Sequence, residues 1–174
     1  MKKLFSILAL LTMFCHVSAQ KKAEDKSKRP SPPAEITQKI PSGATITINY
    51  SKPSVKGRAI GVNLEPMEGK VWRTGANEAT WFQSDKDITI DGMKLPAGKY
   101  GLFTIFNGSK ATLIFNKIWD QWGAFTYKIE EDALRVNATV QVQDPPAEQM
   151  TFSMDKMGKV ELLWGPKKIS FMVQ

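Results

Sequence analysis

The polar side chains best suited to binding a ligand gather in one stretch, residues 52–78. Arg58 and Arg73 carry planar guanidinium groups, which can donate paired hydrogen bonds to a carboxylate or a phosphate. Asn77 can both donate and accept, and Glu78 adds a carboxylate. The stretch therefore predicts a site for a small polar or anionic ligand or a glycan. The candidate ligand-binding residues, two of which lie further along the chain, are Lys52, Arg58, Trp72, Arg73, Thr74, Asn77, Glu78, Asn116 and Trp122.

The same residues also have a structural interpretation. Arg73 and Glu78 could form an ion pair that pins a long loop onto the domain, with Asn77 closing a turn. Buried polar clusters often specify a fold rather than a function. The sequence favours the structural interpretation and leaves the ligand-binding one open.

Tryptophans offer a second kind of binding surface. The chain has five, which are Trp72, Trp81, Trp119, Trp122 and Trp164. Indole rings exposed in a row would form a platform on which sugar rings stack, whereas most tryptophans of a β-sandwich are buried or half-buried. We expect packing for most of them. Trp122, which precedes Gly123, is the best platform candidate.

Acidic residues could instead support hydrolysis. The carboxylates that lie close in sequence are Glu65 with Glu68, Asp85 with Asp87, and the run Glu130-Glu131-Asp132. A general acid among them would need a raised pKa in a cleft, and solvated surface charge is the simpler explanation for each. None of these groups matches a calcium-binding loop. The sequence predicts no metal site and no cofactor.

The N-terminus predicts an exported protein. Lys2 and Lys3 precede an apolar run over residues 4–14, and small residues at 17–19 suit a leader protease, so we expect a signal peptide over residues 1–19. The apolar run is too short to span a bilayer, and we expect no stable membrane insertion after cleavage. The mature protein would be periplasmic or secreted.

Cleavage after residue 19 would remove the only cysteine, Cys15, and the only histidine, His16. Catalytic systems that need a histidine base, and zinc sites built from these residue types, are then excluded. Chemistry by carboxylates, lysines or tyrosines remains, so the sequence argues against an enzyme without excluding one. The net charge of +7 becomes +5 without Lys2 and Lys3, which suits solubility and anionic partners. Because the basic N-terminal stretch lacks aromatic residues, we expect no nucleic-acid binding.

Composition and periodicity predict the elements that must position these residues. Residues 20–35 mix charges with prolines and cannot bury a core, so we expect a disordered spacer followed by one domain over residues 36–174. Alternation of apolar and polar residues predicts strands, and two further stretches that are apolar on both faces predict central strands. The alternating stretches are 45–50, 136–143, 150–154 and 169–173, and the central ones are 100–106 and 111–115.

Turn signals complete this interpretation. Asp91-Gly92 and Asn107-Gly108 suit tight hairpin turns, and further turns are expected at 155–158 and at Gly165-Pro166. A short helical turn near 119–122 or 130–133 is the only helix expected. The fold class predicted is all-β, a single-domain two-sheet β-sandwich or jelly-roll-like architecture with little helix.

Several motifs resemble one exported bacterial family, domain of unknown function 2911. The most specific is Trp-Arg-Thr-Gly-Ala-Asn-Glu at 72–78, and the others, in the order the family shows, lie at 50–58, 95–100, 116–117, 121–125 and 132–136. The resemblance covers about residues 31–174 and implies no established activity. Lys52 stands where the family pattern has arginine, and this exchange would lose paired recognition of a carboxylate or phosphate.

Three functional hypotheses follow. In the first, residues 52–78 and 116–122 converge at one end of the sandwich and bind a polar or anionic small ligand or a glycan. In the second, the protein is a structural or interaction protein of the cell envelope, and the motif determines the fold. In the third, it is a carboxylate-dependent hydrolase in which Glu78 or another carboxylate acts beside Arg73.

Overall fold

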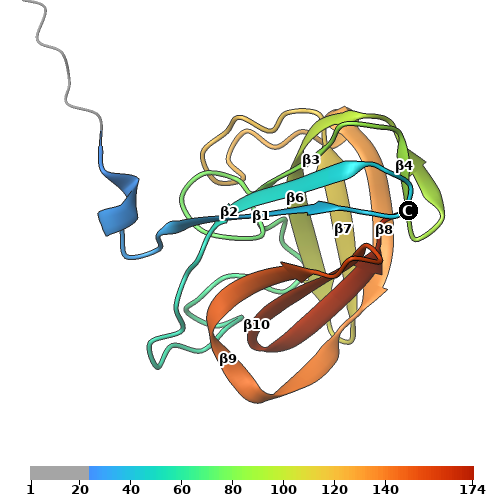
Figure 1. Ribbon diagram of the computed structural model, residues 1–174. Helices are drawn as coiled ribbons and strands as arrows, with labels where there is room; N and C mark the ends of the chain where they lie inside the picture. The colour runs from blue at the N-terminus through green and yellow to red at the C-terminus, as the bar shows by residue number, and fades with distance from the viewer. Residues whose placement is uncertain (1–23) are drawn as a thin grey trace, which may run out of the picture.

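The computed structural model describes residues 24–174, which form ten antiparallel strands and two short 3-10 helices (Figure 1). The first strands are β1 (Pro33–Lys39), β2 (Thr45–Ser51), β3 (Trp81–Ser84), β4 (Ile88–Ile90) and β5 (Met93–Leu95). They are followed by β6 (Gly98–Asn107), β7 (Lys110–Asn116), β8 (Asp132–Thr139), β9 (Gln141–Met154) and β10 (Lys159–Met172). Among these residues, no helix is long and apolar enough to cross a membrane.

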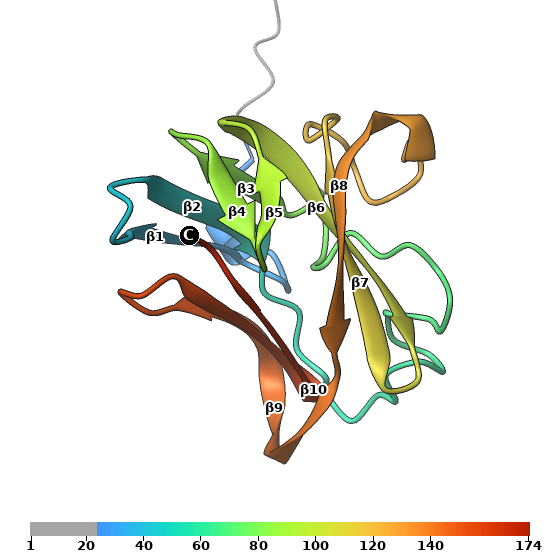
Figure 2. The same ribbon diagram turned by 90° about the vertical axis from the view of Figure 1, so that its right-hand side faces the viewer.

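The strands form two layers. Six of them make one sheet in the order β1-β2-β3-β6-β7-β8. The long hairpin β9-β10 lies against this sheet, as Figures 1 and 2 show. The small hairpin β4-β5 joins the second layer through a bridge between Ile90 and Val173. The prediction of an all-β sandwich is therefore confirmed.

Alternation along the strands places one face of each in the core. In β2, Ile46 and Ile48 are buried. The residues that alternate with them, Thr45, Thr47 and Asn49, are partly exposed. From Tyr100 to Phe106, β6 is buried apart from the half-buried Ile105. Phe103 points to the outer side of the sheet, where the loop between β7 and β8 covers it. This confirms the expectation of central strands at 100–106 and 111–115.

Aromatic contacts hold the two layers together. The ring centroids of Phe82 and Phe115 lie 5.2 Å apart, and Phe115 in turn contacts Phe171 of β10 at 6.1 Å. Tyr50 packs edge-on against Phe152 at 5.0 Å, and its hydroxyl accepts a hydrogen bond from the Phe152 backbone N–H at 3.1 Å. These residues come from both sheets, so their burial depends on the sandwich being closed.

The predicted turns are mostly present. Asp91 and Gly92 both adopt positive φ between β4 and β5, at 47° and 82°, as a tight hairpin turn requires. Two expectations were wrong. Residues 136–143 are not one strand, because Val140 separates β8 from β9, and Gly165-Pro166 lies inside β10 at a shift in register rather than at a turn.

Helical turns occur only where the chain leaves the sheets. A 3-10 helix spans Ile129–Glu131, close to one of the two expected positions, and residues 119–122 are not helical. A further 3-10 helix, Lys26–Lys28, lies in the stretch interpreted as a disordered spacer. Within that stretch, β1 begins at Pro33 and Arg29 forms ion pairs with Glu24 and Glu78, so the boundary at residue 36 was placed too late. The predicted signal peptide lies outside the described residues.

Candidate functional site

The loop between β2 and β3 runs along β6, where Gly69 hydrogen-bonds to Phe106 and Trp72 to Thr104, and its last residues meet the loop between β7 and β8. Glu78 and Trp122 form a β-bridge. On either side of it, the Ala79 N–H donates to the Gln121 carbonyl at 2.9 Å, and the Gly123 N–H donates to the Asn77 carbonyl at 3.1 Å. The last residues of the 52–78 stretch therefore meet the last residues of the 116–122 stretch, whereas Arg58 lies in a different groove.

Trp72 and Thr74 face the core instead of a ligand site. Trp72 is only 2% exposed, packs against Phe106, and donates its indole N–H to the Gly75 carbonyl at 3.0 Å. The Thr74 hydroxyl is fully buried and lies 2.8 Å from that of Thr104 on β6. Both side chains tie the motif to the sheet.

The two asparagines also have structural partners. Asn77 adopts a positive φ of 60° and donates its amide to the Ser31 carbonyl at 3.0 Å. Asn116 is fully buried and donates to the Lys128 carbonyl and to the Asp132 carboxylate, at 2.9 and 2.8 Å. Asn116 thereby organises the loop between β7 and β8 and is not accessible to a ligand.

Glu78 is ion-paired, though not with Arg73. Its two carboxylate oxygens lie 2.8 Å from Lys26 and 2.8 Å from Arg29, both of which precede β1. Burial opposes ionisation of this carboxyl, but the hydrogen bonds from Lys26, from the backbone and from Arg29 together outweigh it and lower its pKa to about 2. The structural interpretation identified the right kind of contact and the wrong partner.

Arg73 has no ion-pair partner among residues 24–174. Its side chain is half-buried, and its Nε is the one buried side-chain polar atom in the described chain without a hydrogen-bond partner. Burial lowers the pKa of Arg73, and only the distant charge of Glu65 opposes this effect.

The remaining candidate residues lie apart from one another. Arg58 donates to the backbone carbonyls of Ser54 and Val55, and it lines a different groove, one shared with residues 146–148 and 165–167. Trp122 is 54% exposed and lies 5.8 Å from the Arg29 guanidinium. Lys52 is half-buried, and its backbone N–H donates to the Pro32 carbonyl at 2.9 Å.

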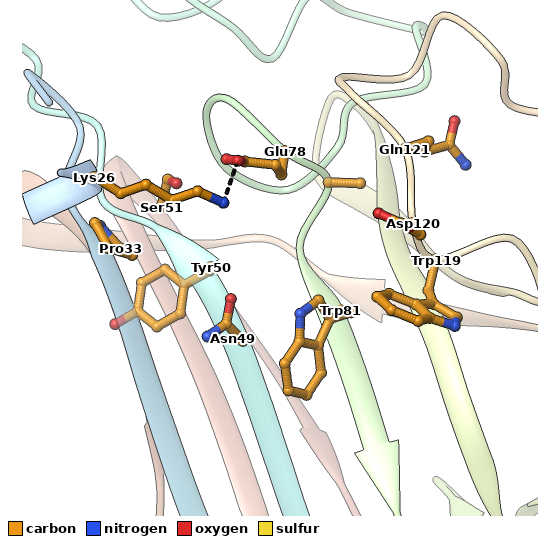
Figure 3. A pocket seen from close by; sticks show the side chains of 11 residues that line it. Lys26, Pro33, Asn49, Tyr50, Ser51, Glu78, Trp81, Trp119, Asp120 and Gln121 are labelled. Carbon is orange, nitrogen blue, oxygen red and sulfur yellow. Dashed lines mark hydrogen bonds and ion pairs between the residues drawn. The ribbon is translucent and has the colours of Figure 1, made fainter. Parts of the chain in front are cut away.

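A pocket of about 280 Å³ opens beside the bridge between the two loops. Figure 3 shows the side chains around it, with Lys26 reaching Glu78 on one side and the indoles of Trp81 and Trp119 on the other. Its lining residues are Lys26, Pro33, Asn49, Tyr50, Ser51, Glu78, Ala79, Trp81, Trp119, Asp120 and Gln121. Of the candidates from the sequence, only Glu78 contributes to it.

The two tryptophans are brought together by the register of the sheet. Trp81 of β3 pairs with Gly101 of β6, which has no side chain. A Cβ at Gly101 would lie 2.8 Å from the Ile118 carbonyl and 3.3 Å from the Trp119 Cα, so glycine lets this loop lie directly on the sheet. Trp119 therefore comes to rest beside Trp81.

Lys99 lies between the two indoles. Its Nζ is 3.6 Å from the centroid of the Trp81 ring and 3.6 Å from that of Trp119. Burial lowers the pKa of Lys99, while the charges of Asp120 and Glu35 act in the opposite direction. A cation over two indole faces is a favourable arrangement, and it fixes the spacing of the rings.

The family model described as Protein of unknown function (DUF2911) matches residues 31–173. The chain belongs to this family. The match confirms the resemblance of the motifs, and it includes both tryptophans of the pocket and Lys99. Lys26 and Arg29, which pair with Glu78, precede the matched region. No curated protein and no solved structure matches the chain.

In this member of the DUF2911 family, most of the acidic residues noted in the sequence have structural roles. Glu65, Asp85 and Asp87 each accept a hydrogen bond from a backbone N–H, and so does Glu68. Asp132 binds Arg135 and the Tyr127 hydroxyl, each at 2.7 Å. Every carboxyl with a shifted pKa in the described part of the chain is shifted downward, namely Glu24, Asp25, Glu78, Asp85 and Glu161.

Sequence reasoning missed Trp81, Lys99 and Trp119 as members of one site. The signal that was available is the alternation of β3 and β6, which points Trp81 and Lys99 to the outer face of the same sheet. The position of Trp119 gave no such signal, because it depends on a loop folding over Gly101.

Proposed function

We propose that this protein binds a neutral glycan in the pocket that Trp81 and Trp119 line. The observation that carries the proposal is the pair of half-buried indoles on the outer face of the sheet, next to polar groups that can bind hydroxyls. The apolar faces of sugar rings pack on aromatic rings, and the hydroxyls around the sugar need donors and acceptors at its rim.

The polar groups of the pocket offer both donors and acceptors. Asp120 is exposed and makes no ion pair within the described residues, so its oxygens are free to accept from a sugar hydroxyl. Lys99 does not line the pocket itself but lies over the rings of its two tryptophans. Its ammonium makes no hydrogen bond to any of residues 24–174 and retains donors for a hydroxyl oxygen. Because a hydroxyl donates and accepts at once, this combination suits a polyhydroxylated ligand.

The balance of charge favours a neutral ligand. Glu78 is neutralised by Lys26 and Arg29, and Arg29 also pairs with Glu24. The negative charge of Asp120 acts to raise the pKa of Lys99, so these two opposite charges offset each other. No excess of positive charge remains to attract an anionic group into this pocket.

Isothermal titration with a panel of neutral oligosaccharides tests the proposal. Binding by the wild type should weaken at least about fivefold in Trp81→Ala and in Trp119→Ala, since a stacked ring contributes about 1 kcal/mol or more. Trp122→Ala is the matched control, because Trp122 is exposed and does not line the pocket. Equal weakening in all three variants, or no binding to any oligosaccharide, would refute the proposal.

The hydrolase hypothesis receives less support. A general acid requires a carboxyl with a raised pKa, and Glu78, the paired carboxyl of the pocket, has a pKa of about 2. The hypothesis of a structural role applies to the motif itself, where Trp72, Thr74 and Asn77 have partners inside the domain.

A further inference from the structure

We infer that Arg73 is the anchor of a second site, one that binds an oxyanion such as a carboxylate, phosphate or sulfate group. Arg73 does not line the pocket of the two tryptophans, so this inference does not depend on the proposed glycan site. It rests on the unsatisfied donors of a guanidinium that the fold holds in place.

The other described arginines have acceptors for their guanidinium groups. Arg29 pairs with Glu24 and Glu78, and Arg135 pairs with Asp132. Arg58 donates to two backbone carbonyls. Arg73 alone among them has neither a carboxylate within ion-pair distance nor an acceptor for its buried Nε.

No carboxylate among residues 24–174 lies within ion-pair distance of Arg73, and only the charge of Glu65 acts on it from further away. Residues 1–23, which precede the described part, contain no aspartate and no glutamate. Glu78, which the sequence made the obvious partner, is already shared by Lys26 and Arg29. A partly buried cation without an anion is unfavourable, so an oxyanion from outside the chain would stabilise it.

The backbone around Arg73 is fixed, so its guanidinium is held in position. Its neighbours Trp72 and Thr74 are buried, and its carbonyl accepts from the Thr80 N–H at 3.1 Å. The side chain consequently points away from the main core, towards the loop between β7 and β8. A ligand would meet a donor group that needs little reorganisation.

Gly123 forms the edge of this site. A Cβ there would lie 3.4 Å from an Arg73 terminal nitrogen and 3.0 Å from the Phe125 ring, and Gly123 has a φ of +67°. These contacts are tight, so Gly123 lets the loop between β7 and β8 pack closely against the guanidinium, beside a ring that is 83% exposed. Planar guanidinium groups bind carboxylates and phosphates through paired hydrogen bonds. Of the Arg73 nitrogens only Nε is both buried and unpaired, so an oxyanion would bind the two terminal nitrogens.

Nitrogen-15 spectra of the arginine side chains test the inference on the wild-type protein. We expect the Nε–H resonance of Arg73 to shift and saturate as inorganic phosphate, sulfate or acetate is added at constant ionic strength with chloride. The Arg58 resonance is the internal control, because its donors bind backbone carbonyls. A shift that is absent, or that grows linearly and equally for both arginines, would overturn the inference.

Two variants add a second measurement. Arg73→Lys keeps the charge and removes the planar pair of donors, so its affinity for the same probe should fall at least about tenfold. Arg58→Lys should bind as the wild type does. Unchanged affinity in Arg73→Lys would refute the site, and the wild-type titration decides the question if that variant does not fold. Acetate and phosphate, compared at equal charge, separate a carboxylate site from a phosphate site.

Discussion

The motif loop and the outer face of the sheet meet at one pocket, yet they use their residues in opposite ways. In the loop, the side chains of Trp72 and Thr74 are buried and hydrogen-bonded within the domain. Glu78 forms ion pairs with two cations from the N-terminal segment. On the sheet, Trp81 and Trp119 keep part of their rings towards the pocket. The dense polar motif makes its contacts within the fold, and residues from three separate segments form the surface for which we propose glycan binding.

The largest difference between the two regions should be in stability. Trp72→Ala removes a fully packed ring and an indole hydrogen bond, and should reduce the free energy of unfolding by about 3–5 kcal/mol. Trp81→Ala, at a half-buried position, should cost about 1–2 kcal/mol. Urea denaturation of both variants measures this contrast. Equal losses of unfolding free energy would mean that Trp72 of the motif and Trp81 of the pocket do not differ in role.

Removing the charge of Glu78 should have a smaller, pH-dependent effect. The carboxyl side chain is 40% exposed, so Glu78→Gln should cost only about 1 kcal/mol at neutral pH, after allowance for solvent screening. Because folding lowers this pKa from 4.5 to about 2, the contribution is complete above pH 4.5 and is lost as the pH falls towards 2.

Thermal denaturation of wild type and Glu78→Gln between pH 7 and pH 2 provides the measurement. The difference in midpoint should shrink below pH 4.5. A difference that is independent of pH over this range would show that the ion pairs with Lys26 and Arg29 do not contribute to stability.

Replacing Lys99 should change the surroundings of Trp81 and Trp119 more than it changes the stability of the fold. Lys99→Met removes the cation between the two indoles and should cost about 0.5–1 kcal/mol of stability. The tryptophan emission spectrum should change, since two of the five indoles lose a charge 3.6 Å from their ring centroids. Lys94→Met, at an exposed residue of β5, is the control. An unchanged spectrum in Lys99→Met would contradict the position of Lys99 between the rings of Trp81 and Trp119.

The smallest effect is expected at Arg73, in contrast to Glu78 five positions along the chain. Arg73→Met removes a half-buried cation that has no partner in the described chain, so stability should change by less than about 1 kcal/mol in either direction. Urea denaturation in a buffer free of oxyanions measures it. A loss of several kcal/mol would show that Arg73 makes a structural contact instead of providing a vacant donor group.

Much of the fold was predictable because its signals are local. The alternation at 45–50 indicates a strand wherever that segment lies, and Asp91-Gly92 forms the same turn in most contexts. The N-terminal segment was less predictable. Its charges indicated disorder, and only the folded domain brings Glu78 within reach of Lys26 and Arg29.

The sequence alone determined the all-β class, the main strands and hairpin turns, and membership of the DUF2911 family, because each depends on residues that are neighbours in the chain. Only the tertiary structure decided which partner Glu78 takes, that Arg73 takes none among the described residues, and that Trp81, Lys99 and Trp119 meet. Those outcomes depend on the register of β3 against β6 and on a loop lying over Gly101. Contacts between distant segments are chosen by the packing of the whole domain, so no local pattern could specify them.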